Sequence, residues 1–200
     1  MTSIKPRKRD VTRAKVIQAA IDCIYAEGFY AAHTNRIAEQ AGVSWGVLQY
    51  HFGDKDGLLQ AVLDTIFANF TASLGKAKLQ QEQLRPRIGE LVNTLWSQVS
   101  QPEYRVSIAI LRNAGRDPDS SIDGGKNLAR WSSEVAAAWD KLFIEYRDQP
   151  IKSATARRLL FAALRGLADE LNPSDKTTRK QLNYELAALT DAIHFLLTGE

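Results

Sequence analysis

The sequence predicts an all-α fold of about nine helices, in which a small three-helix module precedes a larger helical module. Three observations support this prediction. Apolar residues recur at intervals of three and four along almost the whole chain, no segment alternates as a half-buried strand does, and Gly, Pro or capping residues stand at most expected helix ends. The 200 residues, 44% of them hydrophobic, can bury a substantial core.

The first two predicted helices are separated by a short loop. The first runs from Thr12, a candidate N-cap, to the residue before Gly28, and isoleucines recur along it at helical spacing. Thr34 could cap the second, shorter helix, which extends through Ala41. Gly42 then permits a sharp turn.

A third helix is predicted to begin after Ser44, which can cap it, and to end near Phe52 and Gly53. Val43 and Leu48 occupy the two positions of a hydrophobic staple around that cap. The staple is expected to fix the angle at which this helix leaves the turn.

Asp54 can cap a fourth helix, which carries a broad apolar stripe. The stripe consists of Leu58, Leu59, Val62, Leu63, Ile66, Phe67 and Phe70. Because it is too long to serve the small module alone, this helix is expected to connect two modules. We place their boundary after residue 56, which gives modules of residues 1–56 and 57–200.

Further helices are predicted throughout the larger module. Pro86 and Pro102 each open one, and a long helix then ends before Pro150. The last two helices span residues 153–171 and 176–197. Apolar residues of the last helix are spaced alternately by four and three residues, which suits packing against a partner helix. They are Leu182, Leu186, Leu189, Ile193 and Leu196.

Charge and composition exclude several classes of protein. The net charge is only +3, but six of the first fifteen residues are Lys or Arg against Asp10 alone, so a polyanionic partner is expected. No segment has the features of a signal peptide or a membrane span, and we expect a cytoplasmic protein with no membrane partner. Cys23 is the only cysteine, which excludes an intrachain disulfide and suggests a small buried side chain. The histidines, His33, His51 and His194, are too scattered for a metal site, and no cofactor is expected.

Residues 35–59 carry the functional prediction. They contain two short helices joined by a glycine-containing turn, and the second is rich in polar and aromatic side chains, as in a helix-turn-helix. In that motif the second helix enters the major groove of DNA. The groove is about 12 Å wide and only the first turns of a helix approach base edges, so a short helix suffices.

The sequence TNRIAEQAGVSWGVLQYHFGDKDGLLQAVL, preceded by VIQAAIDCIYAEGFYAAH, resembles the TetR family of bacterial transcriptional regulators. Its A-G-V-S turn, Y-H-F and D-K-x-x-L-L patterns are together more specific than a lone helix-turn-helix pattern. The resemblance covers about the first quarter to third of the chain. It implies a homodimeric, all-helical regulator that binds a double-stranded DNA operator through its N-terminal module. The C-terminal module is then expected to bind an unknown small-molecule effector and to dimerise through helices 8 and 9.

The resemblance also assigns DNA contacts by position. Thr34 and Ser44 match positions that contact phosphates in the family. Tyr50, His51 and Lys55 match phosphate or sugar contacts. The residues expected on or near the surface that faces base edges are Trp45, Gly46, Val47 and Gln49.

Two positions depart from the family pattern. The family commonly has a tyrosine where Gln49 stands and a small polar or basic residue where Trp45 stands, so its operators are not transferable to this chain. Glutamine can bond the N6 and N7 atoms of adenine, and Trp45 and Val47 could contact thymine methyl groups or sugars. We therefore expect half-site positions that contain A or T.

Simpler structural interpretations stay open for several of these residues. Trp45 could pack on the first helix, Tyr50 could belong to the core, and His51 could only cap a helix end. The basic N-terminus could be a solvated tail. Beside a helix-turn-helix, however, we expect an arm in which Lys8 and Arg9 contact phosphates or the minor groove.

Aromatic side chains of the larger module could line an effector cavity, although aromatic stripes at helical spacing more often form core. The candidates are Trp96, Tyr104, Trp131, Trp139 and Phe143. Arg112 and Asn113 could orient a ligand. Arg165 interrupts an apolar face, which is costly unless Asp169 or Glu170 pairs with it or a ligand uses it.

The sequence therefore predicts a ligand-responsive repressor that binds a palindromic operator as a homodimer. The alternative is an architectural or nonspecific DNA-binding protein without ligand control. An enzyme has no support, because no Ser/His/Asp set, phosphate loop, zinc pattern or nucleotide fingerprint is present.

Overall fold

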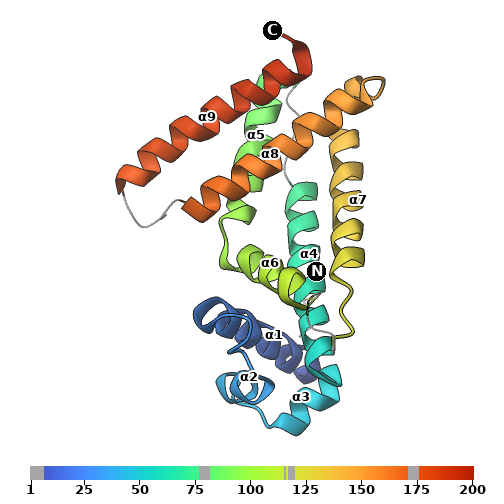
Figure 1. Ribbon diagram of the computed structural model, residues 1–200, viewed down its shortest axis with the longest axis vertical. Helices are drawn as coiled ribbons and strands as arrows, with labels where there is room; N and C mark the ends of the chain where they lie inside the picture. Colours follow the sequence, from blue (N-terminus) through green and yellow to red (C-terminus); the bar gives the residue numbers. More distant parts are fainter. Residues whose placement is uncertain (1–6, 77–81, 115, 117–119, 171–175) are drawn as a thin grey trace. The chain divides into compact units, whose positions relative to one another are not determined.

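The computed structural model describes residues 7–76, 82–114, 116, 120–170 and 176–200. Within these ranges the chain forms nine α-helices and one short 3-10 helix, and no strand, which confirms the all-α class (Figure 1). The helices are α1 (Lys8–Glu27), α2 (Thr34–Gln40), α3 (Trp45–Phe52), α4 (Lys55–Lys76), α5 (Leu84–Val99), α6 (Pro102–Ala114), α7 (Gly124–Leu142), the 3-10 helix Ile144–Tyr146, α8 (Pro150–Glu170) and α9 (Lys176–Thr198).

The chain divides into two compact units. Unit 1 comprises residues 1–68 and 102–128, and unit 2 comprises residues 69–101 and 129–200. Helices α4 and α7 therefore each begin in unit 1 and continue into unit 2. These units describe compactness and not activity, so the functional boundary placed after residue 56 stays a prediction.

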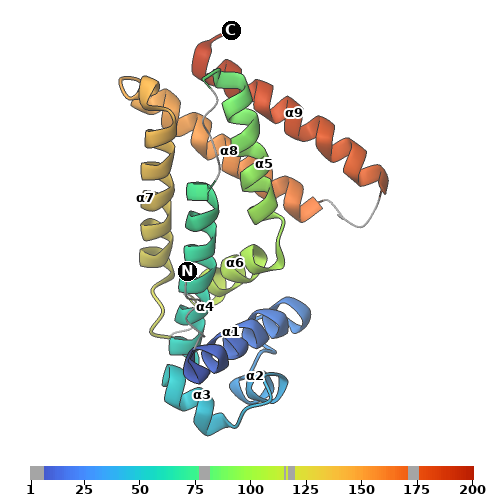
Figure 2. The same ribbon diagram turned by 180° about the vertical axis from the view of Figure 1, so that it is seen from behind.

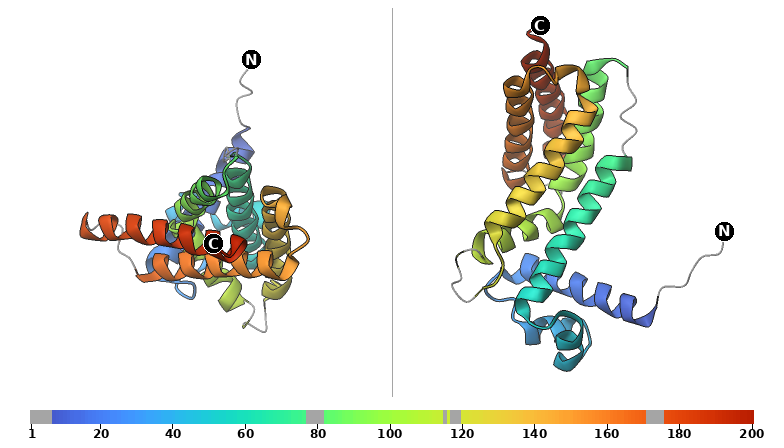
Figure 3. Two further views of the ribbon diagram at one scale, coloured as in Figure 1. Left: turned by 90° about the horizontal axis from the view of Figure 1, so that it is seen from above. Right: turned by 90° about the vertical axis from the view of Figure 1, so that its right-hand side faces the viewer.

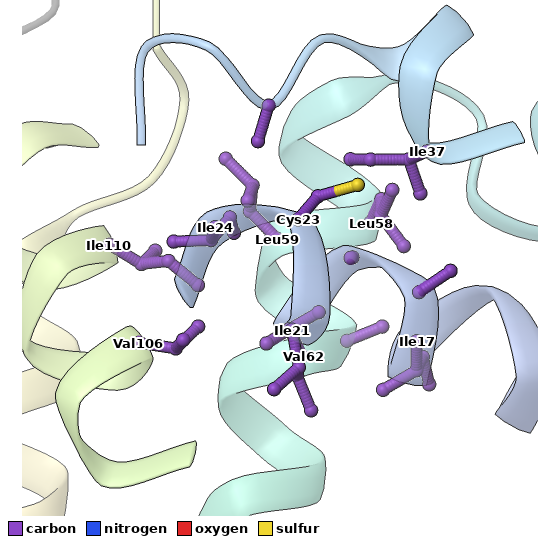
Figure 4. Close-up of a cluster of buried hydrophobic side chains, with 14 of the residues drawn as sticks. Ile17, Ile21, Cys23, Ile24, Ile37, Leu58, Leu59, Val62, Val106 and Ile110 are labelled. Carbon is purple, nitrogen blue, oxygen red and sulfur yellow. The ribbon is translucent and has the colours of Figure 1, made fainter. Parts of the chain in front are cut away.

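Helices α1, α2, α4 and α6, labelled in Figure 2, contribute side chains to the apolar core of unit 1, which Figure 4 shows in close-up. Ile17, Ile21 and Ile24 of α1 are all buried, as their helical spacing predicts. Figure 4 shows them among side chains from α4 and α6, such as Val62 and Ile110. This core supports α1, α2 and the start of α4, between which α3 lies along the chain.

The caps predicted for α1 and α2 are wrong. α1 begins at Lys8, and the Thr12 hydroxyl lies inside the helix, where it donates to the Lys8 carbonyl at 3.0 Å. Arg and Lys are good helix formers and Asp10 lies in the first turn, where the helix dipole favours an acid, so the basic stretch extends the helix. Thr34 is the first residue of α2, and His33 holds the N-cap position without a side-chain cap bond.

The N-cap and the glycine turns predicted around α3 are confirmed. Ser44 is the N-cap, and its hydroxyl accepts a hydrogen bond from the Val47 amide at 3.4 Å. Gly28, Gly42 and Gly53 have φ angles of 87°, 59° and 80°, which a residue with a Cβ rarely adopts. The helix-turn-helix therefore has the glycine-dependent ends that its sequence indicates.

Helix α4 begins as predicted, because Asp54 accepts a hydrogen bond from the Gly57 amide at 2.7 Å. By length and hydropathy alone residues 55–75 could cross a membrane, but half of that segment is buried in the folded chain. Leu58 and Leu59 belong to the core of unit 1, while Phe70 packs edge to face on Trp131 in unit 2. These contacts account for the apolar composition of α4.

In unit 2, α5, α8 and α9 pack on one another, and α8 and α9 run side by side (Figures 1 and 3). Pro102 opens α6 as predicted, whereas α5 begins at Leu84, so that Pro86 lies in its first turn. The long helix predicted to extend past residue 142 ends there and is followed by the 3-10 helix. Pro150 then opens α8, three residues earlier than expected, because proline is well suited to the first helical position.

The heptad-like stripe of α9 faces the interior of unit 2. Leu186 and Ile193 are buried, and Leu182, Leu189 and Leu196 are half-buried. The partner that the spacing of this stripe predicts therefore lies largely within the chain. A different face of α9, with Tyr184 and Phe195, is exposed.

Candidate nucleic-acid interface

A single buried side chain anchors α3. Among its eight residues, all of them described, only Leu48 is fully buried, and Val43 packs against the same core from the turn before the helix. The turn is closed by a hydrogen bond from the Val43 amide to the Ala38 carbonyl at 3.0 Å. The helix thus lies on the module by one face and leaves its opposite face free.

That free face carries the residues predicted to read DNA. Trp45 is 51% exposed and Tyr50 is 72% exposed, and Gly46 and Gln49 between them are exposed as well. Val47 is half-buried. The interpretation that Tyr50 belongs to the core is therefore wrong.

Cationic side chains stand over aromatic rings around the end of α3. The Arg9 guanidinium carbon lies 5.8 Å from the centroid of the Tyr50 ring, and that of Arg13 lies 5.4 Å from the Phe52 ring. The ammonium of Lys55 lies 5.1 Å from the ring of Phe29. The first two contacts place positive charge from α1 beside the end of α3, while the Lys55 ammonium lies over the buried ring of Phe29.

Lys8 and Arg9 do not lie in an extended arm, as the sequence led us to expect. Both are exposed in the first turn of α1, because the helix begins at Lys8. Residues 1–6 lie outside the described residues. The role of Arg13 was missed, although its spacing of four from Arg9 places both arginines on one helix face.

The predicted phosphate contacts differ in exposure. Ser44 is exposed, whereas Thr34, His51 and Lys55 are half-buried. The ring nitrogen Nδ1 of His51 is buried and has no hydrogen-bond partner among the described residues. The end of α3 is closed instead by the Gly53 amide, which donates to the Gln49 carbonyl at 2.8 Å, so His51 does not serve as the cap.

Cys23 has the packing role expected for it. Its side chain is 1% exposed, and the thiol donates to the Gln40 amide oxygen at 2.8 Å, which links α1 to the end of α2. Burial raises the pKa of the Cys23 thiol. Burial and a raised pKa both disfavour the reactive thiolate.

The predicted effector residues are distributed over both units. Tyr104, Arg112 and Asn113 lie in unit 1, and Arg112 is exposed. In unit 2, Trp139 and Phe143 pack with ring centroids 4.3 Å apart. The other candidates in unit 2 are buried Trp131, half-buried Trp96 and exposed Arg165.

Two of these side chains have structural partners. The Trp139 indole donates to the Ser153 hydroxyl at 2.8 Å, as a buried tryptophan requires. The expectation that Arg165 interrupts a buried apolar face is wrong. It is exposed and donates to the Phe161 carbonyl at 3.1 Å, so it needs neither Asp169 nor Glu170.

A groove of about 230 Å³ lies between α5 and α9 within unit 2, over Gly89, Asn93, Asn183 and Thr190 among others. None of the predicted effector residues lines it. Within the described residues, no group of three or more His, Cys, Asp or Glu side chains is arranged to hold a metal ion.

Comparison with known proteins agrees with this geometry. A family model described as bacterial regulatory proteins of the tetR family matches residues 16–62, which include the whole helix-turn-helix. The transcriptional regulator BetI of Paraburkholderia phymatum is 31% identical over 136 residues, which are 66% of this chain and 69% of that protein.

Solved structures extend the likeness to nearly the whole chain. Salmonella enterica GusR superposes with a TM-score of 0.72 at 18% identity, covering 97% of this chain and 99% of that one. The transcriptional regulator FadR of Bacillus subtilis, in complex with stearoyl-CoA, gives a TM-score of 0.64 at 16% identity, with 94% and 98% covered. At such low identity these structures speak for the all-helical fold alone.

Proposed function

This chain belongs to the TetR family of bacterial transcriptional regulators, and from that premise we propose that it is a cytoplasmic repressor that binds a palindromic operator as a homodimer. The observation that carries the proposal is the exposed face of α3. Trp45 and Gln49 are exposed to solvent, and the exposed Tyr50 has the Arg9 guanidinium of α1 over its ring. A short helix with such a face suits the major groove.

Phosphate contacts position the protein on the duplex in this proposal. Thr34, Ser44, His51 and Lys55 supply polar or charged groups, and the Tyr50 hydroxyl extends from an exposed ring. Lys8 and Arg9 add charge from the first turn of α1. Because each neutralised phosphate releases counterions, six to ten such contacts make affinity fall by roughly 10³- to 10⁵-fold between 50 and 200 mM salt.

Base recognition falls to Gln49, Trp45 and Val47, with Gly46 allowing close approach. The Gln49 amide can donate to N7 of adenine and accept from its N6 amino group at the same time, and no other base edge in the major groove matches this bidentate pair as well. The ring of Trp45 and the methyl groups of Val47 favour thymine methyls. Half-sites are therefore expected to contain A or T at the positions below α3.

Dimerisation is assigned to the exposed face of α8 and α9. Leu159 on α8 is 48% exposed, and Tyr184 and Phe195 on α9 are 78% and 58% exposed. Alanines follow these residues along both helices, as in Ala162 and Ala188, and permit close approach of a second pair of helices. A two-fold axis through this face would place two recognition helices on half-sites whose centres are about 34 to 36 Å apart or somewhat more.

A small molecule that binds the C-terminal module is proposed to release the operator. FadR of Bacillus subtilis, which shares the fold, is in complex with stearoyl-CoA, so a ligand in this fold has a precedent. To release the operator, the effector of this chain must bind more tightly to the conformer that cannot bind DNA than to the conformer that can. To move the population ratio of the two conformers from 1:99 to 99:1, its binding free energies to them must differ by about 5.5 kcal/mol.

Selection of bound sequences from random duplex DNA, with the purified full-length protein, tests the proposal. We expect one enriched motif with two-fold symmetry and A or T within each half. An unenriched pool bound with uniform affinity would overturn it in favour of an architectural or nonspecific DNA-binding protein. Two variants distinguish the operator-binding repressor from a nonspecific DNA-binding protein. If binding were nonspecific and used the basic N-terminus, deletion of residues 1–9 would abolish it, and Gln49→Ala would leave it intact.

A further inference from the structure

Two polar ties within unit 1 connect the start of α4 to the start of α7. The first is centred on Asp56, in the first turn of α4 and four residues after the end of α3. Its carboxylate accepts hydrogen bonds from the Ser120 hydroxyl at 3.1 and 3.2 Å and from the Ser121 hydroxyl at 3.0 Å. The backbone amide of Ser121 also donates to it.

The second tie is a reciprocal pair of amides one helical turn further on. Gln60 donates to the Asn127 side-chain oxygen at 3.1 Å, and Asn127 donates back to the Gln60 oxygen at 3.0 Å. Because Gln60 follows Asp56 by four residues, both ties lie on one face of α4. We call Asp56, Gln60, Ser120, Ser121 and Asn127 the α4–α7 latch.

The latch differs in kind from the core beside it. Leu58, Leu59 and Val62 of α4 are buried in apolar contacts, which tolerate small rotations and slips of the helix. Hydrogen bonds are directional, and a bond to a carboxylate is stronger than one between neutral groups. The latch therefore selects one rotation of α4 relative to the segment that leads into α7.

This choice of rotation has a consequence for α3. Only Gly53 and Asp54 separate α3 from α4, and Asp54 caps α4, so the direction of α4 sets the direction of α3. Both α4 and α7 continue into unit 2, which carries the proposed dimer face. The directions in which these two helices leave unit 1 must then be constant if two recognition helices are to keep a fixed separation.

We propose that Asp56, Gln60 and Asn127 are positioning residues, whose latch fixes the half-site spacing that the dimer accepts. This inference rests on the proposed operator-binding dimer. It assigns no DNA contact to the latch, which acts only through α4 and α3. Loss of the latch therefore changes the tolerance for spacing and not the recognition of a half-site.

The test compares the wild-type protein with Asp56→Asn, Asn127→Ala and the double variant, on operators whose half-sites are moved one base pair closer or further apart. The wild type is expected to lose about tenfold or more in affinity at either altered spacing, because each base pair shifts and rotates one half-site. In the double variant we expect the three spacings to differ by no more than about twofold to threefold. Binding to an isolated half-site should be unchanged.

Gln18→Ala is the matched control, since it removes an exposed amide that donates to Asp22, which lies within α1 as well. Thermal unfolding curves are to be recorded for each variant, to check that it is folded. Retention of the wild-type spacing preference in the folded double variant would overturn the inference. Equal weakening at all spacings would do so too, because it indicates a merely structural role.

A second measurement does not depend on DNA. Spin labels at two exposed positions within unit 1, residue 39 on α2 and residue 128 on α7, report the distance distribution between them in the free protein. We expect a narrow distribution in the wild type and a broader one in the double variant. If no duplex shows a symmetric motif, the proposed function fails. The latch is then judged by this distribution alone, and an unchanged width would refute it.

Discussion

Exposed aromatic side chains occur on α3 and on α9, but their surroundings differ. On α3, Tyr50 stands beneath the guanidinium of Arg9, and Trp45 lies on the same short helix. On α9, Tyr184 and Phe195 are separated by alanines and by Asp191, whose partner Arg85 lies 2.6 Å away. Positive charge beside Tyr50 favours a polyanion, and small apolar neighbours beside Tyr184 and Phe195 favour another helix.

Exposure of an aromatic residue therefore does not by itself identify its partner. Large apolar side chains at a surface are found at protein, nucleic-acid and membrane interfaces alike. The charge that surrounds them distinguishes these cases, because burying a cation against an apolar helix is costly while pairing it with a phosphate is favourable. Four predictions test the assignment, beginning with the largest effect.

Charges placed on the α8 and α9 face should separate the proposed dimer. Leu159→Glu combined with Phe195→Glu would bring four like charges together across a two-fold axis, so we expect a folded monomer in sedimentation experiments. Losing the second binding module should reduce operator affinity by roughly 10²- to 10⁴-fold. Ile144→Glu is the control, since Ile144 is 61% exposed on the 3-10 helix. Persistence of the dimer in the double variant would show that this face is not the interface.

Gln49→Ala should cost about 1–3 kcal/mol at one base pair of each half-site and little elsewhere. The reason is that only a base-edge contact discriminates among base pairs. The measurement is binding of wild type and variant to operators that carry every single-base change. If affinity falls equally on all of them, Gln49 touches only the backbone of the duplex.

Arg9→Ala should weaken binding to all sequences nearly equally and reduce the salt dependence by about one released ion per protomer. Its position over Tyr50 holds the charge beside α3 without directing it at a base edge. Arg147→Ala is the control, because Arg147 is likewise an exposed arginine but lies in unit 2. An unchanged slope of affinity against salt for Arg9→Ala would remove Arg9 from the interface.

Some of these features could be predicted from the sequence because they depend on near neighbours. Ser44, Gly28 and Gly53 act within one helical turn, so their roles follow from local patterns. The start of α1 was missed because a run of Arg and Lys can continue a helix as well as form a tail.

Longer-range features had no local signal. The leucine spacing of α9 is the same whether the partner helix belongs to this chain or to another, and the structure buries Leu186 inside unit 2. Asp56 and Ser121 are 65 residues apart, and nothing periodic in the sequence connects them. Exposure of Trp45 and Tyr50 likewise depends on which face of α3 meets the core, which the single buried position Leu48 decides.

The smallest predicted effect concerns Asp123, which belongs to neither face and caps α7. The Lys126 backbone amide donates to its carboxylate at 2.8 Å and the Lys126 ammonium lies at 3.2 Å, and these interactions hold the pKa of Asp123 below its usual value. A lowered pKa in the folded state means that the ionised carboxylate stabilises the protein above the unfolded pKa of about 3.9. This contribution disappears as the pH falls through the folded pKa.

Asp123→Asn keeps a capping oxygen and removes only the charge, so it isolates that contribution. We expect the variant to unfold at a slightly lower temperature than the wild type at pH 7, and the two melting temperatures to converge in strong acid. Operator affinity and the dimer should be unaffected, because the Asp123 side chain is exposed and is not among the residues assigned to either face. A difference in melting temperature that grows as the pH falls would contradict the sign of the pKa shift. A loss of operator binding at pH 7 would instead place the start of α7 within the recognition surface and erase the distinction between the two regions.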